Sequence, residues 1–81
     1  MPRFVRLNDV WRMLDGCLDG YVKSSSREYW TVTFAGRSYR SIPLGRHGHR
    51  HNPEIEAGHI RSLVRFFSIN KTCVDLYVNL D

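Results

Sequence analysis

An alternating run of strand-forming residues, followed by a two-residue turn, predicts a β-hairpin at the centre of the chain. The residues of Tyr29–Phe34 alternate between large apolar side chains and Tyr or Thr, as a half-buried strand does. Ala35-Gly36 makes the turn, and residues 37–44 return as the second strand, with alternate residues on opposite faces. Because Pro43 cannot donate a ladder hydrogen bond, this strand should end there or lie at an edge of the sheet.

Amphipathic helices are predicted on both sides of the hairpin. Apolar residues recur at helical spacing over about residues 8 to 18, with Asn8 placed to cap the first turn and Asp19-Gly20 to end the helix. Gly16 lies inside this pattern, so the last turn should be loose or the helix should end early. The same spacing recurs over residues 57–67, which predicts a second helix.

A short segment that begins at Tyr21 supplies a further strand before the hairpin. The order helix, strand, strand, strand, helix predicts one α+β domain over residues 1–81, with an antiparallel three-stranded sheet and both helices on one face. Residues 70–80 fit a strand by their alternation and a helix with Asn70 as its cap, and periodicity does not decide between the two.

The charge of the chain is basic and uneven. Twelve Lys and Arg against eight Asp and Glu give a net charge of +4, and ten of the twelve are Arg. Residues 37–50 hold four Arg and no acid. Arginine suits phosphate recognition through its planar fork of donors, so this segment predicts an anionic partner or, equally, a basic solvated surface.

Other function classes are excluded by absent features. No segment approaches the roughly 18 apolar residues of a membrane span, and the first residues do not resemble a secretory signal. Cys17 and Cys73 are too few for a disulfide framework and have no partners at zinc-like spacing. We therefore expect a cytoplasmic protein with no membrane association.

Four short motifs, in order, resemble the HicA family of toxins, small ribonucleases of bacterial toxin–antitoxin modules. The matching residues are Gly20-Tyr21 (Gly-Phe in the family), Ile42-Pro43 (Val-Pro), His47-Gly48 (His-Gly) and Gly58–Val64, where the family has Gly-Thr-Leu-Arg-Ser-Ile-Leu. The likeness runs from about residue 7 to residue 77. It implies a double-stranded-RNA-binding-domain-like α-β-β-β-α fold, a short third helix at the C-terminal end, RNA as the substrate and an acidic antitoxin as a partner.

The chain departs from this family at the catalytic signature, which is Gly-Ser-His before the second strand. Ser26, Arg27 and Glu28 stand at those places, so the catalytic histidine is missing. Three alternatives are open: Glu28 has become the base, catalysis has moved to another group such as His47, or the protein only binds RNA. The sequence thus predicts a HicA-like toxin or a toxin-derived RNA-binding protein, with an mRNA endonuclease activity left open.

Three histidines alternate in one loop, at His47, His49 and His51. They lack the thiols or carboxylates that usually complete a metal site, so we expect no metal and no cofactor.

The predicted RNA contacts are basic side chains on the second hairpin strand, in the loop after it and on the second helix. Arg37 and Arg40 should lie on the sheet face or its rim, opposite the helices. For Arg61 an ion pair with Glu54 or Glu56 is an equal alternative. The full predicted set is Arg27, Arg37, Arg40, Arg46, Arg50, Arg61 and Arg65. A non-catalytic module or an adaptor for an acidic protein partner is the alternative function.

Overall fold

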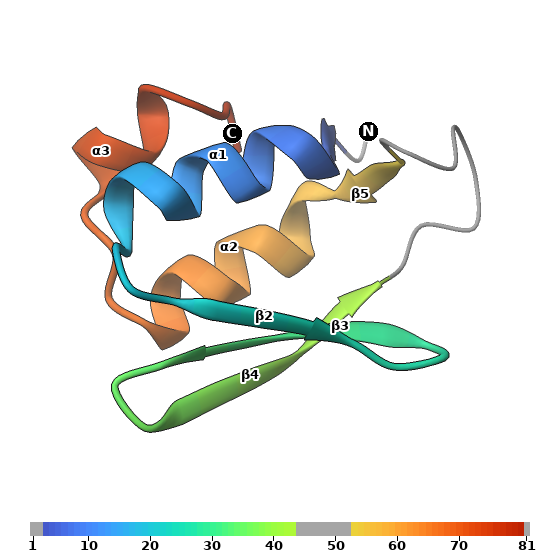
Figure 1. Cartoon of the computed structure of the whole chain (residues 1–81). Helices are drawn as coiled ribbons and strands as arrows, with labels where there is room; N and C mark the ends of the chain where they lie inside the picture. The colour runs from blue at the N-terminus through green and yellow to red at the C-terminus, as the bar shows by residue number, and fades with distance from the viewer. Residues whose placement is uncertain (1–2, 44–52, 81) are drawn as a thin grey trace.

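A three-stranded antiparallel sheet carries the helices of this protein on one face (Figure 1). The structure is a computed structural model and describes residues 3–43 and 53–80. The strands β2 (Val22–Ser25), β3 (Tyr29–Phe34) and β4 (Arg37–Pro43) lie in the order β2-β3-β4. With a helix before and helices after this sheet, the predicted α+β class and its α-β-β-β-α arrangement are confirmed.

The tight turn between β3 and β4 forms as predicted. Ala35 and Gly36 both have a positive φ, 53° and 80° respectively. Positive φ at both central residues is the mark of the hairpin turn whose twist matches that of the flanking strands.

A β-bulge in β4 changes which of its residues face the helices. Ile42 pairs with Trp30, whereas Tyr39 pairs with Val32, so β4 holds one residue more than β3 between these two pairs. Strict alternation would place Ile42 and Tyr39 on opposite faces. The bulge brings both to the helix side, where Ile42 is fully buried. The alternation predicted for this strand is therefore wrong beyond the bulge.

Within the described residues, three helices complete the fold: α1 (Leu7–Cys17), α2 (Ala57–Phe66) and α3 (Lys71–Asp75). The first two agree with the predicted ranges to within one residue at each end. The C-terminal segment is helical because Asn70 caps α3, its side-chain oxygen accepting hydrogen bonds from the backbone N–H groups of Thr72 (2.8 Å) and Cys73 (3.4 Å).

The start of both long helices is organised by a two-stranded ribbon that the sequence did not predict. The strands β1 (Phe4–Arg6) and β5 (Glu54–Glu56) pair antiparallel, and each runs directly into a helix. The first N–H of each helix donates across the ribbon, Leu7 to the Pro53 carbonyl (2.9 Å) and Ala57 to the Arg3 carbonyl (2.8 Å). The ribbon thus holds the beginnings of α1 and α2 side by side (Figure 1).

Asn8 is not the cap of α1, which corrects the prediction. The N-cap position is Arg6, whose backbone is extended and whose side chain makes no capping hydrogen bond. Because the strand ladder already satisfies the first helical N–H, a side-chain cap is not needed for that group. Asn8 lies inside the first turn.

The core lies between the sheet and the helices. Side chains from both layers are fully excluded from water, which ties each element to the others. The largest are Met13, Leu14, Ile42, Ile55, Ile60 and Leu63.

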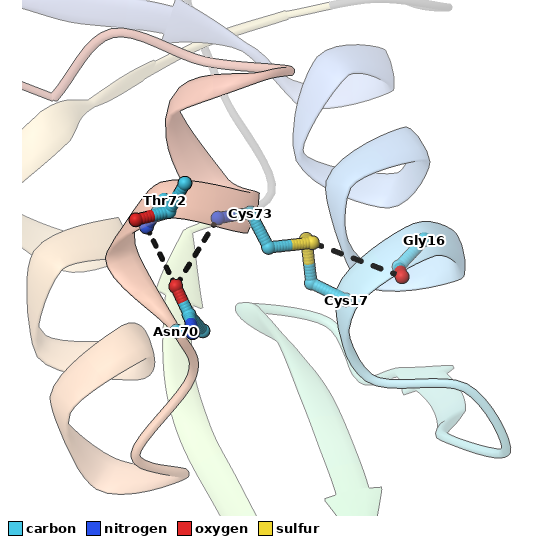
Figure 2. The surroundings of a disulfide bond; sticks show 5 residues. All are labelled: Gly16, Cys17, Asn70, Thr72 and Cys73. Atoms are coloured by element: carbon cyan, nitrogen blue, oxygen red, sulfur yellow. Dashed lines mark hydrogen bonds between the residues drawn. A yellow bond between two sulfur atoms is a disulfide. The ribbon is translucent and has the colours of Figure 1, made fainter.

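The two cysteines form a disulfide between α1 and α3, which the sequence did not predict (Figure 2). Cys17 ends α1, Cys73 lies in α3, and their Cα atoms are 5.9 Å apart. The adjacent Gly16 lets the Tyr77 ring pack closely against α1, because a Cβ at position 16 would lie 2.7 Å from Cζ of Tyr77. Gly16 therefore has a packing role, and α1 continues through it to Cys17 instead of ending early.

Two observations bear on location. No helix within residues 3–43 and 53–80 has both the length and the apolar character needed to cross a membrane. The expectation of a cytoplasmic protein rested partly on the small number of cysteines. Because structural disulfides are typical of oxidising compartments, the Cys17–Cys73 bond means that the cysteines no longer support this expectation.

Candidate nucleic-acid interface

The three strands of the sheet carry basic residues and no acidic ones. Lys23 lies in β2 and Arg37 and Arg40 lie in β4, and none of the three strands contains Asp or Glu. The helix α1, by contrast, presents Asp9 and Asp15. A polyanion therefore meets less electrostatic repulsion at the sheet than at α1.

The sheet face that points away from the helices presents hydroxyl groups and the exposed Arg40. The hydroxyls of Thr33 and Ser38, which are paired across β3 and β4, are hydrogen-bonded at 2.9 Å. At the bulge, Arg40 and Ser41 together oppose Thr31, and both are exposed. Hydroxyls and Arg are the side chains that commonly contact phosphate and sugar oxygens.

Arg37 faces the helices, which corrects the prediction that it lies on the opposite side. Its guanidinium carbon is 4.3 Å from the ring centroid of Phe66 in α2. Its cross-strand partner is Phe34, which also packs against the core. The cation–π contact with Phe66 explains why this Arg takes the inner side.

Lys23 makes a similar contact, which no sequence pattern predicts. Its ammonium group lies 4.5 Å from the ring centroid of Trp11 in α1, and its cross-strand partner Val32 is fully buried. A single cation in a short polar strand gives no periodic signal, so only the register reveals its side. Of the three strand cations, Arg40 is therefore the one on the outer face.

The turn between β2 and β3 holds Arg27 and Glu28, the first of the predicted catalytic residues. Ser26 closes this turn: its hydroxyl oxygen accepts from the N–H groups of Glu28 (3.3 Å) and Tyr29 (3.2 Å). Arg27 and Glu28 are both exposed, and the Glu28 carboxylate bonds no described residue. The turn presents a cation and an anion to solvent side by side.

The β2–β3 turn lies beside the end of β4, and the remaining predicted residues come after β4 in the sequence. Tyr29, the first residue after the turn, pairs with Pro43, the last residue of β4. The segment 44–52 comes next in the chain and contains the predicted residues Arg46, His47 and Arg50. These three, together with His49 and His51, lie outside the described residues.

Arg61 and Arg65 lie away from the sheet face, beside α3. Both line a cavity of about 220 Å³ between α2 and the C-terminal segment. Arg61 donates a hydrogen bond to the backbone carbonyl of Leu80. Among the described residues, Arg61 forms no ion pair with Glu54 or Glu56, so this alternative prediction is wrong. Among the described residues, Arg61 and Arg65 thus lie on a different surface from Arg27 and Arg40.

The one described group with a clearly shifted pKa is Tyr21, which follows α1. Partial burial, reinforced by its hydrogen bond to Asp15 (2.9 Å) and the charge of that carboxylate, raises the pKa of Tyr21 to about 12. The phenol therefore stays protonated and acts as a donor at neutral pH.

The described residues contain no cluster of His, Cys, Asp or Glu suited to a metal ion. The one described histidine, His59, is half-buried in α2, where its backbone carbonyl accepts a hydrogen bond from the Tyr39 hydroxyl at 3.3 Å.

Comparison of the chain with protein-family models, with curated proteins and with solved structures finds no match. The resemblance to the HicA family therefore stays a prediction.

Proposed function

We propose that this protein binds structured RNA, as a HicA-like toxin or a toxin-derived RNA-binding protein. The observation that carries the proposal is the acid-free sheet, whose outer face combines Arg40 with hydroxyl groups. Double-stranded RNA is contacted largely through phosphates and 2′-hydroxyls, which such side chains match without reading bases. Arg27, in the turn between β2 and β3, would extend this surface. The basic residues of segment 44–52, which follows β4 in the sequence, would add positive charge.

Binding is better supported than cleavage. General acid–base catalysis needs a positioned group beside the reacting atoms and a partner that orients it. Glu28 lies in an exposed turn without such a partner among the described residues. Endonuclease activity through Glu28 or His47 is therefore the finer proposal, and RNA binding does not depend on it.

A second candidate function is docking of an acidic protein partner, such as an antitoxin of the kind that the resemblance implies. The positively charged cavity beside α3 favours it. In a toxin–antitoxin module the protein would meet both partners in the cytoplasm, where thiols are kept reduced. RNA binding should therefore be measured on the reduced and on the disulfide-bonded form.

The test is salt-dependent binding of a labelled RNA duplex of about 16 base pairs, the length a double-stranded-RNA-binding domain spans. The logarithm of the binding constant falls as the logarithm of the salt concentration rises. Each lost phosphate contact should make this negative slope shallower by about one. Arg40→Ala should do so, whereas Arg12→Ala, an equal charge change on α1, should leave the slope unchanged. Absence of binding at low salt, or equal effects of the two variants, would refute the proposal.

A further inference from the structure

The cavity between α2 and α3 combines an apolar floor with a charged rim. The floor is formed by Val64, Val74 and Leu80, and the rim by Arg61, Arg65, Lys71 and Asp75. Val74 and Leu80 are buried and Val64 is half-buried, so the floor is fixed by the core. The apolar part of its lining is larger than the polar part.

The rim charges are not equivalent. Arg61 is held by the Leu80 carbonyl, and the ammonium of Lys71 lies 3.5 Å from the Asp75 carboxylate. Arg65, exposed in the last turn of α2, has no hydrogen-bond or ion-pair partner within the described residues. Three cations and one carboxylate leave an excess of two positive charges around the floor, and Arg65 is the guanidinium still open to a carboxylate.

The size of the cavity selects the class of occupant. Small-molecule and cofactor sites usually measure about 300–1,000 Å³, so about 220 Å³ is too small for most such ligands. It suits one apolar side chain of a larger partner, the kind of anchor that dominates many protein interfaces.

The lining argues for peptide over nucleic acid. Proteins that bind single-stranded nucleic acid usually stack the bases on aromatic rings, and none of the seven lining residues is aromatic. The two Arg of the lining stand at the rim, and Arg61 is held there by the Leu80 carbonyl. Phosphates would meet the rim, but they offer nothing to cover the aliphatic floor. A peptide that carries carboxylates next to an aliphatic side chain matches both parts.

We propose that this cavity is a docking site for an acidic peptide segment of a partner protein. One aliphatic side chain of the peptide occupies the floor formed by Val64, Val74 and Leu80, and a neighbouring carboxylate binds the Arg65 guanidinium in bidentate geometry. The site lies on a different surface from Arg27 and Arg40, so it does not depend on RNA binding.

The test is a titration of ¹⁵N-labelled protein with the peptide acetyl-Glu-Glu-Leu-Glu-Glu-amide, followed by amide chemical shifts up to millimolar concentration. Shifts should be confined to residues 61–65, 71–75 and the neighbourhood of Leu80. Two matched peptides separate the contributions: Ser in place of the central Leu removes the anchor, and Gln in place of every Glu removes the charge. Each should bind several-fold more weakly.

Two protein variants localise the charge contact. Arg65→Glu should weaken binding by about tenfold or more, the equivalent of one charge-assisted hydrogen bond. Arg12→Glu changes the net charge equally, on α1, and should leave affinity within twofold. Both positions are exposed, and the amide spectrum reports whether each variant is folded.

Several outcomes would overturn the inference: no shifts at millimolar peptide, equal binding of the Gln peptide, or equal effects of the two variants. A titration with duplex RNA separates this site from the proposed function. If RNA instead of the peptide shifts residues 61–65 and 71–75, the cavity belongs to the RNA surface and the inference fails. If RNA shifts nothing while the peptide binds, the proposed function fails and the inference stands.

Discussion

At the scale of single residues, Ser68 shows how one backbone conformation ends α2. Ser68 has φ of 53°, the left-handed region in which glycine is favoured. The N–H of Ile69 bonds the Val64 carbonyl (3.0 Å) and the N–H of Ser68 bonds the Arg65 carbonyl (3.2 Å). This is the Schellman arrangement, which usually places Gly where Ser68 stands.

Ser68→Gly should therefore stabilise the protein. Glycine adopts positive φ without steric cost, so the free energy of unfolding should rise by about 0.5–1 kcal/mol. The matched control is Ser62→Gly, the same chemical change at an exposed position inside α2, which should lower stability by about 0.5 kcal/mol. Urea unfolding of the three proteins measures both effects. Destabilisation by Ser68→Gly would show that the serine side chain has a role that the backbone geometry does not explain.

At the scale of elements, the connection between α1 and α3 combines a covalent bond with a close packing contact. Because α3 has only five residues, it cannot be stable as an isolated helix and depends on its neighbours. The Asn70 cap and the Cys17–Cys73 bond hold it in place (Figure 2). The close packing of Tyr77 against Gly16 holds the same segment.

Loss of the disulfide should lower the free energy of unfolding by about 2–4 kcal/mol. The bond closes a loop between cysteines 56 positions apart, and a cross-link of this span restricts the unfolded chain strongly. Denaturant unfolding with and without a thiol reductant measures the effect. A variant with both Cys17→Ser and Cys73→Ser is the control, since it should resemble the reduced protein and ignore the reductant. A midpoint that reductant leaves unchanged would mean that the bond does not form in solution or does not stabilise the fold.

The helices and strands also show which parts of the fold a sequence pattern can predict and which it cannot. Periodicity locates α1, α2 and β3 because each has several apolar residues at regular spacing. The strands β1 and β5 have three residues each, with one buried side chain apiece, Val5 and Ile55, which is too short for any period. The ribbon that they form then replaces the side-chain cap predicted at Asn8.

At the scale of the whole molecule, the fold class is readable from the order of elements, but the surfaces are not. The β4 bulge and the cation–π contact with Phe66 place Arg37 toward the helices, although it is close to Arg40 in sequence. The disulfide partners are 56 positions apart, and two cysteines alone do not indicate pairing. The cavity beside α3 joins residues from three segments, and its only sequence signal is the repeated Arg on α2.

The proposed RNA binding leaves RNA cleavage open, and substitutions at Glu28 test whether cleavage accompanies it. We expect the natural chain to bind the duplex without cleaving it, because Glu28 places a carboxylate, and no imidazole, at the position that the resemblance makes catalytic. Glu28→His should introduce a group that titrates near neutral pH and remove a charge that repels phosphate. RNA cleavage should then appear with an optimum near pH 7, measured on labelled RNA and by growth arrest on expression.

The control Glu28→Gln removes the same charge without adding an imidazole, so it should bind RNA at least as tightly as the natural chain and cleave none. The Glu28 side chain is exposed, and the Ser26 hydroxyl holds the turn through backbone N–H groups that both substitutions keep. Neither change should therefore unfold the protein. If the natural chain degrades RNA and Glu28→Gln stops it, Glu28 is itself the base and the protein is an active nuclease. If all three proteins bind RNA and none cleaves it, the resemblance to the toxins does not extend to catalysis. In that case RNA binding without cleavage would be the reason why the strands of the sheet contain no acidic residues.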